Sequence, residues 1–206
     1  MIETTLYYIY DPMCSWCYAF KPTLEEVKKQ LPKDIKLEYI PGGLAPHNNE
    51  AMPLHMREKI ESIWYQIEEV VGTKFNHDFW KNCTPKRSTY LACQATLASK
   101  AQGKEEQMIN AIQEAYYLKA LNPSEEETIL SLAKEIKLDE RQFKSDLYSQ
   151  KTINEFEEKM NFRRKINLNS FPSLAINYKN KLYALNIKYN DANFIVKQIN
   201  QVNNNL

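Results

Sequence analysis

One stretch near the N-terminus decides the fold, and it consists of Leu6-Tyr7-Tyr8-Ile9-Tyr10-Asp11-Pro12-Met13-Cys14-Ser15-Trp16-Cys17. The apolar run at residues 6–10 is typical of a buried strand, and an amphipathic helical pattern begins after Cys14. A Cys-X-X-Cys motif at a strand-to-helix junction puts its first sulfur at the helix N-terminus, where free N–H groups and the helix dipole favour a thiolate. Because a thiolate is the species that attacks disulfides, the motif predicts a redox site.

The spacing of the two cysteines fits this chemistry. Two intervening residues put the second sulfur about one helical turn from the first, within reach of a disulfide bond. We therefore expect Cys14 to attack a disulfide and Cys17 to resolve the mixed disulfide. Two alternatives stay open: half of a zinc site, and a pair of inert buried cysteines. The remaining thiols and histidines show no spacing that completes a zinc site, so we expect no metal; they are Cys83, Cys93, His47, His55 and His77.

Composition limits the possible partners. The chain has 206 residues, of which 43% are hydrophobic, and a formal net charge of +1. This length suits one domain, with or without a large insertion, and the charge gives no reason to expect nucleic acid or an anionic membrane. A signal-peptide pattern is missing, and so is any apolar run of about eighteen residues. We expect a cytoplasmic protein. In the reducing cytoplasm a dithiol is more often catalytic than structural. Its oligomeric state stays open.

The segments that follow the motif alternate between helix and strand patterns. Apolar residues recur at helical spacing from Cys17 to Leu31, and Pro22 should bend this helix because proline lacks a backbone N–H. Residues 35–40 then alternate between apolar and polar types, which is a strand pattern that Pro41-Gly42-Gly43 ends. The chain is therefore predicted to begin as β-α-β.

Helical patterns alone occupy the chain from about Pro53 to Asn167. The expected helices have apolar stripes over residues 56–71, 108–116 and the span between Pro85 and Gly103, with capping boxes at Ser124 with Glu127 and at Asp139 with Gln142. Strand patterns return at residues 172–176 and 182–185, which predicts a hairpin. A last helix should begin near Asn190 or Asp191.

This order of elements predicts an α/β protein with a thioredoxin fold, β-α-β followed by β-β-α, and a large all-helical insertion. We assign residues 1–50 to the N-terminal part of that fold, which holds the Cys-X-X-Cys motif. Residues 51–167 form the insertion, and residues 168–206 form the C-terminal part with its proline loop.

Several motifs together carry a family resemblance. They are Asp11-Pro12-Met13-Cys14-Ser15-Trp16-Cys17-Tyr18, Gly42-Gly43-Leu44, Phe79-Trp80, the run from Pro85 to Cys93, and Phe171-Pro172-Ser173-Leu174. With them the chain resembles the DsbA-like proteins of the thioredoxin superfamily, most closely the branch of cytoplasmic protein-disulfide isomerases related to FrnE. The resemblance spans nearly the whole chain.

The resemblance implies further site residues. It implies a cis bond at Phe171-Pro172, although most X-Pro bonds are trans. Around Cys14 and Cys17 it implies support from Pro12, Ser15, Trp16, Phe171 and Pro172, and substrate binding by Trp16, Tyr18, Phe171 and Ser173. We expect Trp16, Tyr18 and Phe171 to form an apolar patch that suits unfolded protein segments or small thiols.

Cys93 needs separate treatment, because the resemblance carries a cysteine at this position. If a helix begins at Pro85, Cys93 lies about 14 Å along the axis from Cys83, too far for a disulfide, which needs Cα atoms within about 7 Å. We therefore expect no Cys83–Cys93 disulfide and a buried Cys93 on an alanine-rich helix. A third thiol that faces the dithiol stays an alternative.

These observations predict a thiol-disulfide oxidoreductase that exchanges disulfides with dithiol- or disulfide-containing proteins or small thiols. We expect no metal or organic cofactor, and glutathione is a candidate redox partner. One alternative is a kappa-class glutathione transferase or a 2-hydroxychromene-2-carboxylate isomerase, although those relatives have a serine in place of the Cys-X-X-Cys. An alternative of another class is a non-catalytic thiol- or metal-binding module. Nothing visible in the sequence encodes the reduction potential or whether the enzyme acts as reductase, oxidase or isomerase.

Overall fold

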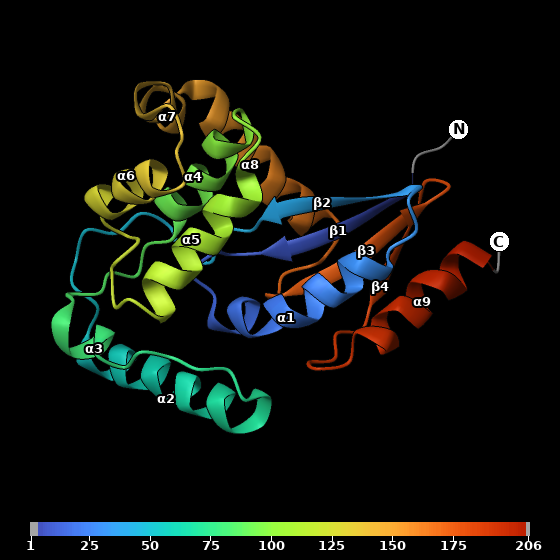
Figure 1. Cartoon of the computed structure of the whole chain (residues 1–206), viewed down its shortest axis with the longest axis horizontal. Coiled ribbons are helices and arrows are strands. Elements are labelled where there is room, and N and C mark those ends of the chain that lie inside the picture. The colour runs from blue at the N-terminus through green and yellow to red at the C-terminus, as the bar shows by residue number, and fades with distance from the viewer. Residues whose placement is uncertain (1–3, 205–206) are drawn as a thin grey trace.

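Four strands form one sheet with the order β2-β1-β3-β4 (Figure 1). This is a computed structural model, and it describes residues 4–204. The strands are β1 (Thr4–Tyr10), β2 (Ile35–Pro41), β3 (Ser173–Tyr178) and β4 (Lys181–Leu185). β1 pairs in parallel with β2 and antiparallel with β3, and β4 pairs antiparallel with β3. Lys179 and Asn180 take positive φ in the turn between β3 and β4, so the predicted hairpin is confirmed.

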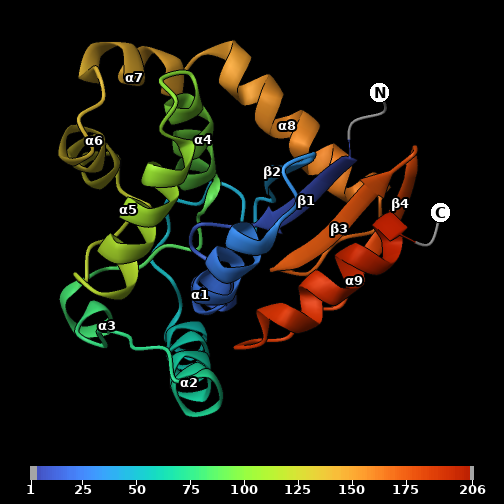
Figure 2. The same cartoon turned by 45° about the vertical axis from the view of Figure 1, so that its right-hand side comes forward.

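Helices cover both faces of the sheet, which explains why β1 carries a continuous apolar and aromatic run from Leu6 to Tyr10. α1 (Ser15–Gln30) and α9 (Ala192–Asn204) lie on one face (Figure 2), where the ring of Tyr8 meets that of Phe20 of α1. α8 (Gln150–Lys165) crosses the other face, and its Phe162 packs on Tyr7 with the ring centroids 4.9 Å apart. Successive strand residues point to opposite faces, so Tyr7 and Tyr8 belong to different layers.

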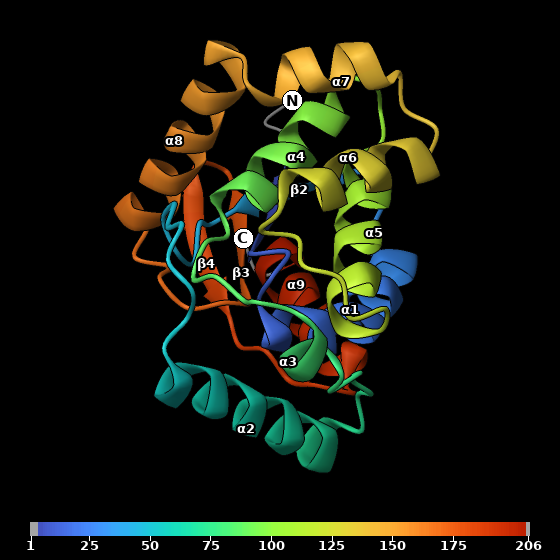
Figure 3. The ribbon, with the colours of Figure 1, turned by 90° about the vertical axis from the view of Figure 1, so that its left-hand side faces the viewer.

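The insertion lies between β2 and β3. Its helices are α2 (Leu54–Val71), α3 (Phe79–Asn82), α4 (Tyr90–Lys100), α5 (Glu105–Tyr117), α6 (Glu126–Glu135), α7 (Glu140–Leu147) and α8. α2 lies at the opposite end of the insertion from α6 and α7 (Figure 3). Trp64 of α2 is fully buried in a core of its own, against the rings of Phe75, Phe79, Trp80, Tyr116 and Tyr117. This core and the core of the sheet both contact Trp16 and Tyr189, so the two parts of the molecule meet beside the Cys-X-X-Cys motif.

The predicted fold class is confirmed, and two predicted helix starts are wrong. α4 begins at Tyr90 and not at Pro85, because residues 85–89 form a loop in which the carbonyl of Pro85 accepts a hydrogen bond from the N–H of Met52. Ser124 does not cap a helix, since its hydroxyl donates to the carbonyl of Ser88 and α6 begins at Glu126. The start signal at Asp139 is confirmed, because its carboxylate accepts the N–H of Gln142.

The division of the chain at residues 50 and 167 stays a prediction. The first boundary falls between β2 and α2, and the second falls between α8 and β3. Within residues 4–204, no helix combines the length and the apolar character that a bilayer crossing requires.

Candidate active site

Cys14 lies where β1 passes into α1. It is the residue before the first turn of α1, in an extended conformation with φ −89° and ψ 117°, and its carbonyl accepts the first helical hydrogen bond from Tyr18. The backbone N–H of Cys14 donates to the carbonyl of Asp11, which closes the turn between strand and helix. The first turn of α1 contains no acidic residue. The Cys14 sulfur therefore lies at the positive end of a 16-residue helix, where a negative charge is stabilised.

Cys17 lies behind Cys14 and is sealed from solvent. Its exposed fraction is 0%, whereas Cys14 is 7% exposed and lines a cavity. Burial raises the pKa of the Cys17 thiol well above its usual range, and the neighbouring Cys14 sulfur raises it further. Burial therefore favours the protonated form of the Cys17 thiol. The roles of Cys14 as attacking thiol and Cys17 as resolving thiol stay a prediction.

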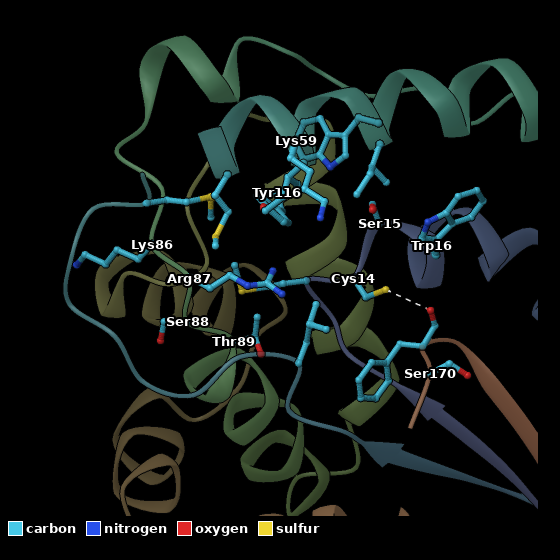
Figure 4. A pocket seen from close by; sticks show the side chains of 18 of the residues that line it. Cys14, Ser15, Trp16, Lys59, Lys86, Arg87, Ser88, Thr89, Tyr116 and Ser170 are labelled. Atoms are coloured by element: carbon cyan, nitrogen blue, oxygen red, sulfur yellow. Dashed lines mark hydrogen bonds between the residues drawn. The ribbon is translucent and has the colours of Figure 1, made fainter. Parts of the chain in front are cut away.

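The loop before β3 completes the sheet side of the site. The Phe171-Pro172 bond is cis, as the resemblance implied. The Cys14 sulfur donates a weak hydrogen bond to the carbonyl oxygen of Phe171, 3.7 Å away (Figure 4). The ring of Phe171 occupies the space beside Gly42, where an added Cβ would lie 1.9 Å from Cε1 of the ring. Arg163 fixes this arrangement, because its Nε donates to the carbonyl of Gly42 and its guanidinium lies 5.1 Å from the ring centroid.

Asp11 belongs to the site, although the sequence did not predict it as a site residue. Its carboxylate is fully buried and accepts hydrogen bonds from the N–H groups of Met13 and Leu44 and from the hydroxyl of Thr89. Burial raises the pKa of Asp11, and these donors offset part of the effect. One carboxylate thus joins the active-site turn, the loop after β2 and the start of α4. The available signal was a charged residue directly between an apolar strand and the Pro-Met-Cys turn.

Cys93 also contacts Asp11. Its buried sulfur lies 3.4 Å from Oδ2 of Asp11, and burial raises its pKa well above the usual value for a thiol. The sulfur of Cys83 instead donates to the carbonyl of Ala120, 3.1 Å away. The prediction of a buried Cys93 on an alanine-rich helix is confirmed, and both thiols are free. The distance argument against a Cys83–Cys93 disulfide was wrong in its premise, because α4 begins at Tyr90 and not at Pro85.

A cavity of about 420 Å³ opens beside Cys14 (Figure 4). Its sheet side is formed by Leu44, Asn169, Ser170 and Phe171. The insertion supplies the opposite wall from α2, the loop before α4, and α5: Met56, Lys59, Ile60, Ile63, Trp64, Lys86, Arg87, Ser88, Thr89 and Tyr116. No described residue with a carboxylate side chain lines the cavity, whereas three cationic residues do. Lys86 is paired with Glu125 at 3.0 Å, so Lys59 and Arg87 are the cations left for a ligand among the described residues.

The structure brings only some of the predicted site residues to this cavity. Ser15 and Trp16 line it together with Phe171, and Pro12 is buried in the turn before Cys14. Tyr18 does not line it, because its ring stacks on that of Tyr117 with centroids 4.6 Å apart. Ser173 does not line it either, since its hydroxyl donates to the carbonyl of Ser170. Residues two apart on a helix do not face each other, and of this pair only Trp16 lines the cavity.

The described part of the chain contains no cluster of three or more histidine, cysteine, aspartate or glutamate side chains that could hold a metal ion. Cys14 and Cys17 thus have no further ligands grouped with them there.

Comparisons with known proteins place this architecture. A family model described as thioredoxin matches residues 7–198. Among curated proteins the chain is 27% identical to the ClpXP adapter protein SpxH of Halalkalibacterium halodurans over 150 residues, which cover 70% of this chain and 49% of the relative. It is 24% identical to SpxH of Bacillus subtilis over 173 residues, which cover 82% and 57%. The chain therefore spans about half the length of the curated relatives that it matches.

Solved structures match over almost the full length. A candidate protein disulfide isomerase from Nitrosomonas europaea superimposes with a TM-score of 0.85 at 21% identity, and covers 97% of each chain. The cytosolic disulfide reductase DsbM from Pseudomonas aeruginosa superimposes with a TM-score of 0.81 at 20% identity, over 97% of this chain and 98% of DsbM. These likenesses show the fold, and the predicted resemblance to DsbA-like proteins is confirmed. The chain belongs to the thioredoxin family and has the DsbA-like form of its fold.

Proposed function

We propose that this protein is a thiol-disulfide oxidoreductase in which Cys14 attacks and Cys17 resolves. One observation carries the proposal: Cys14 lines a cavity at the N-terminus of α1, while Cys17 is completely buried behind it. A helix N-terminus at the edge of a cavity favours a reactive thiolate, whereas complete burial favours a thiol. The asymmetry therefore assigns different chemistry to the two sulfurs of one motif.

The reaction proceeds in two exchanges. The Cys14 thiolate attacks one sulfur of a substrate disulfide, so a Cys14–substrate bond forms and the other substrate sulfur leaves as a thiolate. Cys17 then attacks the Cys14 sulfur, the Cys14–Cys17 disulfide forms, and the second substrate sulfur leaves. Two electrons have passed to the substrate, and a thiol reductant resets the pair. The same steps in reverse oxidise a dithiol, and isomerisation would combine the two directions.

The cavity wall supports an anionic small thiol as redox partner. Lys59 and Arg87 are cations without carboxylate neighbours in the lining, and Met56 and Tyr116 supply apolar surface beside them. Glutathione carries carboxylates and an aliphatic body, which fits this combination. One solved structure of DsbM contains GSH, and that protein is a cytosolic disulfide reductase. We therefore propose a glutathione-linked reductase of the cytoplasm.

The test is a titration of the Cys14–Cys17 couple in glutathione buffers, read by mass mapping of alkylated thiols. A potential near that of thioredoxin, about −270 mV, would support the reductase, and one near that of DsbA, about −120 mV, would support an oxidant. Cys17→Ser should accumulate a mixed disulfide on Cys14, and Cys14→Ser should abolish insulin reduction. Cys83→Ser is the matched control, because Cys83 is half-buried and lies outside the cavity lining. Slow, pH-independent alkylation of Cys14 would contradict the proposal.

The alternative of a glutathione transferase or 2-hydroxychromene-2-carboxylate isomerase has less support. Those proteins have a serine in place of the Cys-X-X-Cys motif, whereas this chain has a cysteine at position 14, with Ser15 next to it in the cavity lining. It would be favoured if Cys14→Ser retained glutathione conjugation. For the metal-binding alternative, zinc binding to the reduced protein would be the supporting result.

A second candidate function is that of a protease adapter, because the curated relatives named above are ClpXP adapter proteins. This chain covers about half of their length. The adapter function would be favoured if a Cys14→Ser/Cys17→Ser double variant still accelerated degradation of a ClpXP substrate. An oxidoreductase would lose its activity in the same variant.

A further inference from the structure

A second, much smaller cavity reaches Cys17, and among the described residues it shares no lining residue with the active-site cavity. Its volume is about 20 Å³, and it lies in the seam where α1 meets α5 above β1 and β2. The lining residues are Tyr8, Cys17, Lys21, Leu24, Glu25, Tyr39, Glu106, Ile109, Asn110 and Gln113. A cavity needs about 15 Å³ of this kind of volume to hold one water molecule, so this space admits a single water.

Gln113 supplies the polar partner that such a water requires. Its side chain is 2% exposed, and its Oε1 is buried with no hydrogen-bond partner among the described residues. Buried amide oxygens are nearly always hydrogen-bonded, because an unpaired one costs about 1–3 kcal/mol. A water in the seam would donate to Oε1 of Gln113 and keep a lone pair for a neighbouring donor. Cys17 is the thiol that lines the same space.

The outer end of the seam is polar and reaches the surface. Lys21 and Glu25 of α1 face Glu106 of α5 there, and Lys28 pairs with both glutamates across the two helices. Burial lowers the pKa of Lys21, so its amine exchanges protons more readily than that of a solvated lysine. The seam thus extends from the buried Cys17 thiol, past the buried amide of Gln113, to a partly exposed cluster of charged side chains.

We propose that this seam is the proton exit of Cys17, in which Gln113 positions one water that takes the proton when Cys17 attacks the mixed disulfide. The proposal rests on the proposed oxidoreductase function. As the Cys17–Cys14 bond forms and the Cys14–substrate bond breaks, the electron pair of the broken bond leaves on the substrate sulfur. The proton of Cys17 passes to the water and then to the carboxylates at the mouth and to solvent. Gln113 is a positioning residue in this step and does not touch the reacting sulfurs.

Other ionisable groups around Cys17 do not supply this exit. They are Cys14 on α1, Asp11 after β1, Tyr8 on β1, Tyr39 on β2, Tyr117 on α5 and Tyr189 before α9. Burial raises the pKa of each of these tyrosines, so they stay neutral at physiological pH. Asp11 is fully buried, so a proton on its carboxylate would have no direct path to solvent. The seam is therefore the route that connects Cys17 to titratable groups in contact with solvent.

The test separates the two exchanges in time. Reduced protein with the Cys83→Ser substitution is mixed with 5,5′-dithiobis(2-nitrobenzoate) in a stopped-flow instrument. The first release of nitrothiobenzoate reports attack by Cys14, and the second reports attack by Cys17 on the Cys14 mixed disulfide. Gln113→Leu should slow the second release at pH 7 by about tenfold or more, because proton transfer to a positioned group contributes at least that much. It should leave the first release unchanged and move the pH profile of the second release upward.

Controls distinguish a proton path from a packing effect. Gln107→Leu makes the same substitution on an exposed residue of the same helix and should change neither release. Gln113→Glu, which keeps a polar oxygen in the seam, should restore the second release. The proton-exit proposal would be overturned if the second release were as fast in Gln113→Leu as in Gln107→Leu. If Gln113→Leu does not fold, as judged by circular dichroism, Gln113→Met takes its place, because it also removes the amide oxygen, and an unchanged second release in that variant overturns the proton exit. Absence of the first release in the parent protein would instead overturn the oxidoreductase function.

Discussion

The sheet side and the insertion side of Cys14 contribute in different ways. On the sheet side, contacts to Cys14 come from the backbone, namely the carbonyls of Asp11 and Phe171. On the insertion side, the cavity wall consists of side chains from α2, α5 and the loop before α4. Backbone contacts are the same for every substrate, whereas we expect a charged side chain such as Arg87 to distinguish substrates by charge. The comparison teaches that changes on the sheet side should affect all substrates alike, and changes on the insertion side should affect only some.

The largest effect is expected where the two sides join, at Gly43. Its φ is +65°, and an added Cβ would lie 2.7 Å from the sulfur of Met160 and 2.9 Å from the ring of Tyr90. Gly43→Ala combines a left-handed backbone with overpacking, so it should lower the free energy of unfolding by about 3 kcal/mol. Urea denaturation measures this. A stability equal to that of the parent protein would mean that the joint between the loop after β2 and the insertion adapts freely.

Gly42→Ala tests the sheet side alone. The added Cβ would clash with the ring of Phe171, and displacement of this residue would move the carbonyl that faces Cys14. A misplacement of about 1 Å can cost about a hundredfold in rate, and we expect that loss for insulin and for glutathione disulfide alike. Stopped-flow rates of Cys14 oxidation measure it. Gly103→Ala is the control for the rates, because nothing lies within 4 Å of its added Cβ and the backbone strain from its φ of +69° falls outside the cavity lining. A loss confined to one substrate would break the comparison.

The third prediction concerns how the stability of the protein depends on pH through Glu105, the first residue of α5 in the insertion. Burial raises the pKa of Glu105 from 4.5 to about 7, so the folded state holds this proton more tightly than the unfolded state does. Its contribution to stability is therefore favourable at low pH and is lost as the pH rises from 4.5 through about 7. With allowance for partial exposure, Glu105→Gln should be more stable than the parent at pH 8 by about 2 kcal/mol and equal to it at pH 4. Denaturation at both pH values checks this, and a pH-independent difference would contradict it.

The smallest effect is expected for Arg87→Gln. Loss of this cation from the cavity wall should weaken the reaction with glutathione disulfide by about fivefold, the value of one exposed charge pair at about 1 kcal/mol. The reaction with an uncharged aliphatic disulfide should not change, and this difference would sharpen the contrast between the two sides. Arg141→Gln on the exposed face of α7 is the matched control. An equal loss for both disulfides would show that Arg87 acts on the structure and not on substrate charge.

The sequence predicted those parts of the fold that local patterns determine. The strand alternation at residues 35–40 and the turn at 178–181 are local, and the structure confirms both elements. The start of α4 was predicted wrongly because Pro85 is a favoured first residue of a helix. In the structure Thr89 precedes that helix, and its hydroxyl donates to Asp11 from a distant part of the chain. Such a contact depends on tertiary structure and has no local signal.

The same reason limited prediction of the site. Cys14, Cys17 and Phe171 were found because the motif and the resemblance mark them. Lys59 and Arg87 lie on separate elements, and only the folded insertion brings them to one wall. Tyr18 packs on Tyr117 and not at the cavity, because residues two apart on α1 point in different directions. Closeness to the motif in the sequence does not reveal this.

The hydrogen bonds of the Asp11 carboxylate determine when the turn that carries Cys14 is completed during synthesis of the chain. It links the turn that carries Cys14 to Leu44 and to Thr89, which lie in the later loop and in the insertion. The turn is thus complete only when segments synthesised much later have docked on it. A nascent chain of which only β1 and α1 have left the ribosome lacks the hydrogen bonds of Asp11 with Leu44 and Thr89. The turn that carries Cys14 is therefore completed together with the insertion and not when β1 and α1 alone have formed.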